Sequence, residues 1–172
     1  MPRNIEVKLR IDSRDTLLPL AQALSTDGLE LIEQDDTFFD ARQGRLKLRQ
    51  FADGSGELIQ YHRPDTAAAK ASEYVRVAAP DPQALREALM RSCGLLGRVR
   101  KTRWLLMAGR TRIHLDRVDG LGDYLELEVV LREGEADAMG VAEAQGLLRA
   151  LGLGDAPQET GAYLDLLQQG RR

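Results

Sequence analysis

The sequence predicts an α+β fold in which about eight strands close into a barrel and helices pack against its outside. Strand-like segments recur along the chain, and most of them alternate charged with apolar residues. The segments between them carry apolar stripes at helical spacing, and such helices could cover the apolar strand faces. About eight strands is a size at which a barrel can close around one small ligand. On pattern alone, an open sheet with its charged face in water is the alternative.

The first two predicted elements are a strand and a helix. Residues 4–11 alternate with period two, which predicts a strand whose charged face carries Glu6, Lys8 and Arg10. Residues 16–28 have an apolar stripe at helical spacing, and Gly28 is suited to end that helix.

The middle of the chain is predicted to be rich in strands, at residues 30–40, 45–51, 57–63 and 72–78. The Gly-rich turn at residues 52–56 joins two of them in a hairpin, and Pro64 ends the third strand. Residues 81–93 form a helix in which Asp81 is the N-cap, and Gly94 and Gly97 end it. A second hairpin at 98–107 and 110–118, a turn at 119–122, a strand at 124–131 and helices at 141–151 and 159–169 complete the prediction.

Composition favours one compact domain over residues 1–172. The chain is 43% hydrophobic and 30% charged, which excludes wholly disordered and collagen-like proteins. A net charge of -3 and a pI near 5.5 argue against broad electrostatic binding to nucleic acid or acidic membranes. No apolar run approaches the ~20 residues that cross a bilayer, so a cytoplasmic protein is expected. The single cysteine, Cys93, excludes an internal disulfide.

Basic residues recur on the predicted strands at a spacing that places pairs of them on one face. Lys47 and Arg49 are two residues apart, and Lys101 and Arg103 repeat this arrangement. The full basic set is Lys8, Lys47, Arg49, Arg63, Lys70, Arg98, Arg100, Lys101 and Arg103. Converging cations repel one another unless a polyanion compensates them, and arginine suits phosphate because its fork donates two parallel hydrogen bonds. Solvated surface charge is the alternative interpretation.

A smaller acidic set has the residue types that a hard metal ion prefers. Glu126 and Glu128 share one strand face, and Asp116 precedes the Gly-rich turn that leads to them. With Glu6 they would offer carboxylate oxygens to Mg²⁺ or Mn²⁺, and phosphate oxygens would complete the coordination. A solvated acidic strand face is the alternative. The two histidines, His62 and His114, each stand alone, and no Gly-rich phosphate loop, Ser-His-Asp signature or dinucleotide fingerprint is present.

Short motifs follow one another in order along nearly the whole chain. They are Asn-Ile-Glu-Val-Lys at 4–8, Gln-Asp-Asp-Thr-Phe-Phe-Asp at 34–40, Leu-Lys-Leu-Arg at 46–49, Tyr-His-Arg-Pro at 61–64, Lys-Thr-Arg at 101–103, the stretch from Ile-His-Leu-Asp to Leu-Glu-Leu-Glu at 113–128, and Ala-Tyr-Leu-Asp-Leu-Leu at 162–167. This ordered set resembles the CYTH superfamily, the triphosphate tunnel enzymes, which include class IV adenylate cyclases, thiamine triphosphatases and inorganic triphosphatases.

The resemblance implies a closed, antiparallel eight-stranded tunnel with a charged lumen. It also implies site residues. The substrate-binding set would be Lys8, Lys47, Arg49, His62, Arg63, Lys101 and Arg103, and the metal-binding set would be Glu6, Asp116, Glu126 and Glu128. Glu6, Lys8 and Arg103 would act in catalysis. The cofactor would be Mg²⁺ or Mn²⁺, and catalysis would consist mostly of charge neutralisation and in-line positioning of the phosphoryl group.

Two residues depart from the family pattern. The first Glu of the opening motif is replaced by Asn4, which can still coordinate through its carbonyl oxygen but removes one negative charge. His62 stands where many relatives hold a Lys, and it would be only partly charged near neutral pH, although Arg63 could compensate.

Several functions therefore stay open. The first is a cyclase that converts ATP to cAMP and pyrophosphate, and the ending at residues 113–128 tilts the resemblance toward it. The others are an inorganic or thiamine triphosphatase, a non-catalytic polyphosphate or nucleotide binder, and an interaction domain with solvated charges. The expected partner is a small-molecule triphosphate such as ATP, thiamine triphosphate or tripolyphosphate, with no nucleic acid and no membrane. A homodimer is a possible assembly.

Overall fold

Eight strands and four helices make up the part of the chain that the structure, a computed structural model, describes: residues 3–62 and 70–170. In chain order they are β1 (Arg3–Arg10), α1 (Arg14–Leu24), β2 (Glu30–Phe39), β3 (Arg45–Phe51), β4 (Gly56–His62), β5 (Lys70–Ala79), α2 (Pro82–Cys93), β6 (Leu95–Ala108), β7 (Thr111–Val118), β8 (Gly122–Val130), α3 (Asp137–Ala150) and α4 (Tyr163–Gln169).

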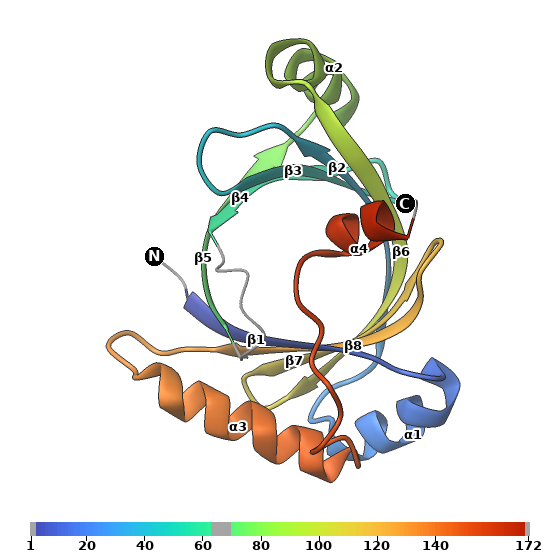
Figure 1. The fold of residues 1–172 in the computed structure, drawn as a ribbon, viewed down its shortest axis with the longest axis vertical. Coiled ribbons are helices and arrows are strands. Elements are labelled where there is room, and N and C mark those ends of the chain that lie inside the picture. Colours follow the sequence, from blue (N-terminus) through green and yellow to red (C-terminus); the bar gives the residue numbers. More distant parts are fainter. Residues whose placement is uncertain (1–2, 63–69, 171–172) are drawn as a thin grey trace.

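The strands form one closed barrel in the order β1-β5-β4-β3-β2-β6-β7-β8, and Figure 1 looks along its bore. Every neighbouring pair is antiparallel, including the β1–β8 pair that closes the ring. The predicted closed eight-stranded barrel is therefore confirmed. Closure decides where the charged faces lie, because alternate side chains of a barrel strand point either into the bore or out toward the helices.

Helices α1, α2 and α3 cover the apolar outer face. Ile5 and Leu9 on β1 and Leu127 on β8 pack with Leu17 of α1 and Leu148 of α3. These side chains are nearly inaccessible to water, and burying each of them fully contributes about 1.5–3 kcal/mol. On the opposite side of the ring, α2 packs against β2 and β3 (Figure 1).

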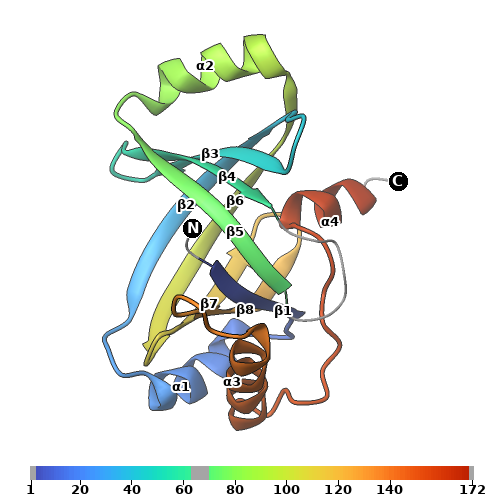
Figure 2. The same cartoon turned by 90° about the vertical axis from the view of Figure 1, so that its left-hand side faces the viewer.

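The fourth helix has a different place. Figures 1 and 2 show α4 at one end of the barrel, where Tyr163 and Leu164 join Phe38 of β2 and Val99 of β6 in a second apolar cluster. Gly97 permits this contact, because a Cβ there would lie 2.5 Å from Leu164 Cδ1. Gly97, predicted from the sequence to end a helix, lies within β6 instead, where it leaves room for α4.

The last helix is also shorter than predicted. The expected helix spanned residues 159–169, but α4 begins at Tyr163. The residues before it extend along β1 instead: Glu159 N donates to Lys8 O over 2.8 Å, and Gln158 forms an isolated bridge with Leu9. Gly161, with φ of 80°, then turns the chain into the helix. Helix α1 likewise ends at Leu24 rather than near Gly28.

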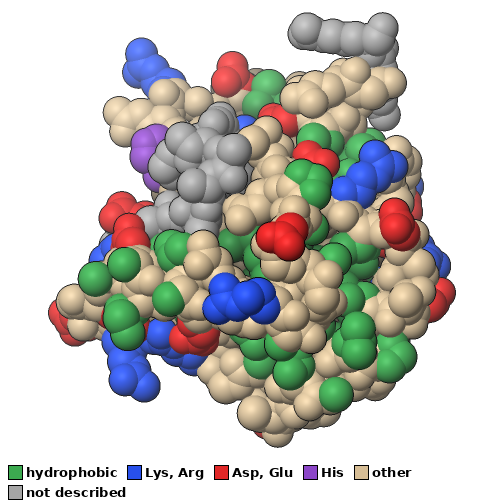
Figure 3. Space-filling model, turned by 60° about the horizontal axis from the view of Figure 1, so that its bottom comes forward, with side chains coloured by type: hydrophobic (Ala, Val, Ile, Leu, Met, Phe, Trp, Pro, Cys, Tyr) green, Lys and Arg blue, Asp and Glu red, His purple; other side chains and the backbone are tan. Residues whose placement is uncertain are grey.

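The outer surface contrasts with the interior. Figure 3 shows acidic, basic and apolar side chains interspersed over the face that includes the lower part of Figure 1. Within residues 3–62 and 70–170, no helix has the length and apolar character needed to span a membrane.

Candidate functional site

All eight strands contribute side chains to a cavity of about 270 Å³ inside the barrel. The predicted charged faces therefore meet one another across the bore. This arrangement differs from a solvated surface, since several of the charged side chains are at most 6% exposed. Buried charges are costly unless they are paired or bind a ligand, so their pairing indicates what the cavity can bind.

The first cluster is centred on Asp36 of β2, which is 1% exposed. Arg49 of β3, its cross-strand partner, donates two hydrogen bonds of 2.8 Å to the carboxylate. Lys47 Nζ lies 3.0 Å and Lys101 Nζ 3.6 Å from Asp36 Oδ2. One carboxylate thus faces three cations, and the cluster carries an excess of positive charge. We call these four residues the Asp36 cluster.

The pKa values in this cluster reflect competition between burial and charge. Burial would raise the pKa of Asp36, but the Arg49, Lys47 and Lys101 charges outweigh burial and hold the pKa well below its ordinary value. Burial lowers the pKa of Lys101 to about 7, despite the nearby Asp36. Burial and the Arg49 charge also lower the pKa of Lys47. An additional anion close to Lys47 and Lys101 would therefore stabilise the protonated, charged forms of both side chains.

A second cluster surrounds Arg103 of β6. Arg103 donates hydrogen bonds of 2.7 and 2.6 Å to the two oxygens of Asp116 and one of 3.1 Å to Glu126. The hydroxyl of Tyr163, from α4, donates a third hydrogen bond to Asp116 over 2.9 Å. Burial would raise the pKa of Asp116, but the Arg103 charge and hydrogen bonds lower it. Asp116 is wholly inaccessible to water and has both oxygens occupied.

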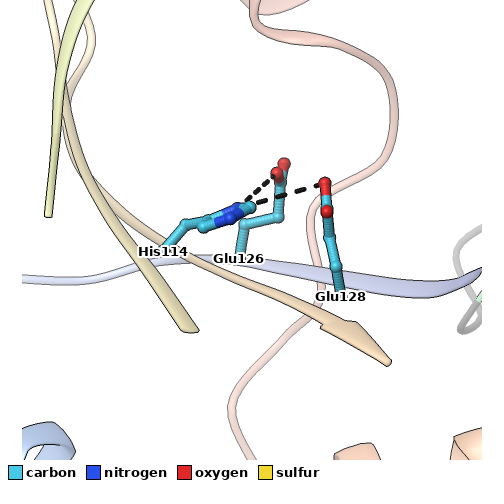
Figure 4. Close-up of side chains that lie close together, drawn as sticks. All are labelled: His114, Glu126 and Glu128. Carbon is cyan, nitrogen blue, oxygen red and sulfur yellow. Dashed lines mark hydrogen bonds and ion pairs between the residues drawn. The ribbon is translucent and has the colours of Figure 1, made fainter. Parts of the chain in front are cut away.

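Three potential metal ligands lie together on β7 and β8. His114 Nδ1 is 3.2 Å from Glu126 Oε1 and 4.0 Å from Glu128 Oε1. Figure 4 shows these side chains converging on one region of the bore. Among the described residues this is the one group of three or more His, Cys, Asp or Glu side chains whose ligand atoms all lie within 4.8 Å of one another.

Strand β1 adds charges to the same wall. In the β1–β8 register Lys8 is opposite Glu126 and Glu6 is opposite Glu128. Lys8 Nζ lies 3.3 Å from Glu126 Oε2 and 3.7 Å from Glu6 Oε1. Burial would raise the pKa of Glu126, but the Lys8 and Arg103 charges hold it well below its ordinary value. Glu126 is therefore ionised near neutral pH.

Most residues of the predicted set share the cavity. The lining includes Glu6, Lys8, Lys47, Arg49, Lys101, Arg103, Glu126 and Glu128. Asp116 points into the same interior but lies beneath Arg103 and Tyr163, outside the cavity lining.

Other predicted residues are not brought together with these. His62 is exposed and lies on the outer face, because the alternation of β4 places its neighbour Tyr61 in the cavity lining. Arg98 and Arg100 also point outward, where both pair with Asp35. The predictions for Arg63 and for the Lys70 side chain lie outside the part of the structure that is described.

Several charged or polar residues of the site were not predicted from the sequence, and they include Asp36, Arg112, His114 and Tyr163. Asp36 was visible as an acid in phase with Phe38 on β2, but its three cationic partners come from other strands. Arg112, also in the cavity lining, lies 3.4 Å from Glu128 Oε2. Tyr163 had no periodic signal, because it enters the bore from the start of α4.

Glu6, Glu126 and Glu128 line one side of the cavity, which we call the carboxylate wall, and their chemistry fits a hard divalent cation. The Asn4 side-chain oxygen is buried in the cavity lining without a hydrogen-bond partner among the described residues. It shares a strand face with Glu6, whose cross-strand partner is Glu128. An orphaned amide oxygen beside two carboxylates is an oxygen-donor set of the kind that Mg²⁺ and Mn²⁺ prefer.

Comparison with known proteins gives a family and a fold. The family model described as the CYTH domain matches residues 2–163. No curated protein sequence matches the chain.

The solved structures that resemble this one include the PH1012 protein of Pyrococcus horikoshii OT3, at 24% identity and a TM-score of 0.83, covering 95% of this chain and 99% of that one. A candidate adenylate cyclase from Vibrio parahaemolyticus has 20% identity, a TM-score of 0.77 and coverage of 96% and 97%. A candidate adenylyl cyclase from Hippeastrum, described as having a dominant triphosphatase activity, has 21% identity, a TM-score of 0.70 and coverage of 97% and 96%. At these identities the likeness shows a common fold.

Proposed function

Because the chain belongs to the CYTH family, we propose that it is a divalent-metal-dependent enzyme that binds a triphosphate inside its tunnel. The observation that carries this proposal is the Asp36 cluster, in which one buried carboxylate faces three cations. A triphosphate would neutralise the excess positive charge. Arg49 would bind phosphate oxygens through the N–H groups that do not donate to Asp36, and Lys47 and Lys101 would act as point charges.

The opposite wall would hold the metal ion. Glu6, Glu126 and Glu128 are the proposed ligands from the family pattern, and the Asn4 oxygen and His114 lie where they could complete the set. Asp116 is better suited to holding Arg103 in place, since both of its oxygens are engaged. When bound, the ion would neutralise phosphate charge that develops in the transition state.

The reaction we favour is cyclisation of ATP. The ribose 3′-hydroxyl attacks the α-phosphorus and loses its proton to solvent, the bond from the α-phosphorus to the oxygen that bridges it to the β-phosphorus breaks, and pyrophosphate leaves with that oxygen. Lys8 and Arg103 would stabilise the charge on the phosphoryl oxygens, and Glu6 would orient the attacking hydroxyl. Hydrolysis of the terminal phosphate is the second candidate, supported by the triphosphatase activity ascribed to the Hippeastrum protein of the same fold. It needs the same cations and differs in how the tail of the substrate is oriented.

Product analysis tests the proposal. We expect the protein with Mn²⁺ or Mg²⁺ to release cAMP and pyrophosphate from ATP, and inorganic phosphate without cAMP would identify hydrolysis instead. Glu126→Ala should abolish either activity, while Glu87→Ala on the exposed face of α2 should leave it intact. Parental turnover in the Glu126 variant would reject the proposed metal assignment.

A non-catalytic binder is the third candidate. Asn4 is the observation that favours it, because asparagine in place of the family's glutamate removes a negative charge from the carboxylate wall. Calorimetry with ATP and tripolyphosphate distinguishes the two cases. Tight binding without any product, under every metal tested, would replace the enzyme proposal with this one. Restoring the charge with Asn4→Glu should then strengthen metal binding.

A further inference from the structure

The wall of the tunnel formed by β4 and β5 carries two tyrosines. The cavity-lining residues of β4, and of β5 from residue 73 onward, are Glu57, Ile59, Tyr61, Tyr74 and Arg76. Tyr61 and Tyr74 are direct cross-strand partners, so their side chains leave neighbouring positions on the same face. Both are partly exposed. Two tyrosines thus leave adjacent positions on this wall, and the other aromatic residues that line the cavity, among those described, are Phe38, Phe51 and Tyr163.

This aromatic pair adjoins the Asp36 cluster. Lys47 Nζ lies 5.6 Å from the centroid of the Tyr61 ring and also binds Asp36. The guanidinium carbon of Arg76 lies 5.6 Å from the Tyr74 ring centroid. A ligand whose phosphates reach Lys47 therefore has an aromatic surface beside it for whatever is attached to those phosphates.

We propose that Tyr61 and Tyr74 form a subsite for a neutral aromatic base, so that the tunnel prefers a nucleoside triphosphate to tripolyphosphate or thiamine triphosphate. The inference rests on the proposed function, because it assigns the tail of a triphosphate that binds in the same tunnel. Tyr61 and Tyr74 are specificity-determining residues in this account, and the cations beside them bind the phosphates.

Two physical arguments favour a neutral aromatic base as the group attached to the triphosphate. Stacking of a base on an aromatic side chain is favourable for every base, since each has a π-face, and a bare tripolyphosphate gains nothing from these rings. The cation–π interaction could instead favour the thiazolium ring of thiamine triphosphate. Lys47 and Arg76, however, already place positive charge against Tyr61 and Tyr74, so a second cation there would be repelled.

Competitive calorimetry at one fixed free Mg²⁺ concentration tests the subsite. The measured quantity is the ratio of the affinities for ATP and tripolyphosphate. We expect Tyr61→Ala and Tyr74→Ala each to lower this ratio about tenfold, and the matching Phe variants, which keep the ring, to restore it to within about twofold. Val75→Ala is the matched control, because Val75 is next to Tyr74 on β5 but is 46% exposed on the outer face. The parent should bind thiamine triphosphate more weakly than ATP.

The outcomes separate this inference from the function on which it rests. If the parent binds tripolyphosphate but its ATP:tripolyphosphate ratio does not respond to either Ala variant, the subsite is rejected and the triphosphate tunnel stands. Tighter binding of thiamine triphosphate than of ATP would reject it as well. If the parent binds neither ATP nor tripolyphosphate, the proposed function and the subsite fall together.

Discussion

The two charged walls of the tunnel differ in their balance of acids and cations. On the side formed by β2, β3 and β6, the three cations of the Asp36 cluster share one acid. On the side formed by β1, β7 and β8, three acids face three cations, because Glu6, Glu126 and Glu128 pair with Lys8, Arg103 and Arg112. The first wall suits an anion with several charges, and the second suits a metal cation. The bore is therefore polarised across its width, although the net charge of the chain is only -3.

The largest expected effect comes from Arg103, which joins the two walls. Arg103→Ala leaves the buried Asp116 without its main cation, and it leaves Glu126 with Lys8 but without its second cation. Removing one partner of such a buried group should lower the free energy of unfolding by about 3–5 kcal/mol. Turnover should fall about 100-fold or more through lost charge stabilisation. Urea unfolding and steady-state kinetics measure the two effects.

The control for this change is Arg91→Ala, which removes an exposed ion pair on α2 and should alter stability by less than about 1 kcal/mol. Equal stability of the Arg103 and Arg91 variants would mean that the two walls are not coupled through Arg103.

Asp36 tests the cationic wall itself. Asp36→Asn keeps the shape of the side chain but leaves Lys47, Arg49 and Lys101 without their shared anion, so the free protein should lose about 3 kcal/mol of stability. Tripolyphosphate should then raise the melting temperature of the variant more than that of the parent, because the ligand supplies the missing negative charge. A smaller ligand-induced shift in the variant would contradict the assignment of this wall to phosphate.

Glu128 tests the carboxylate wall. Glu128→Gln removes one charge next to His114 and Glu6, and Mn²⁺ affinity measured by electron paramagnetic resonance should fall about tenfold. Glu133→Gln, an exposed acid shortly after β8, is the matched control and should bind Mn²⁺ like the parent. If both variants bind Mn²⁺ equally, the metal does not bind at this wall.

Lys101 gives the smallest effect near neutral pH, where the expected result is a change in pH dependence. Burial lowers its pKa to about 7 from an ordinary 10.5, so between these pH values the folded protein binds fewer protons here than the unfolded chain. Its stability should therefore rise with pH across that window, relative to Lys101→Met, which cannot titrate. Lys101→Arg stays charged and should gain no such stability. Parallel pH profiles for the parent and Lys101→Met would show that burial does not perturb this lysine.

The sequence could predict which side chains of one strand share a face, but not which side chains meet across strands. Alternation along one strand is a local signal, so the shared faces of Glu6 with Lys8 and of Lys47 with Arg49 followed from spacing. Their repetition was compatible with a barrel and with an open sheet, and the family resemblance implied the closed barrel. Partners across strands are not local. The convergence of three cations on Asp36 depends on the β2–β3 and β2–β6 registers, which no single segment specifies.

The predicted position of His62 is wrong by one residue along β4. A motif comparison assigned His62 to the site, but the side-chain period of two puts Tyr61 inside and His62 outside. Tyr163 illustrates a further limit, because it reaches Asp116 from a helix that begins only after residues 158–159 have paired with β1. That pairing is tertiary and carries no periodic signature.

A calorimetric titration of tripolyphosphate into the parent, Arg49→Ala and Arg98→Ala, each with saturating Mn²⁺, measures whether the bore binds a polyphosphate. We expect saturable binding to the parent. We also expect a loss of about tenfold or more in Arg49→Ala, which removes a guanidinium from the bore, and no change in Arg98→Ala, whose side chain points outward. Equal affinities for all three proteins, or no binding to the parent, would contradict binding of a triphosphate in the bore.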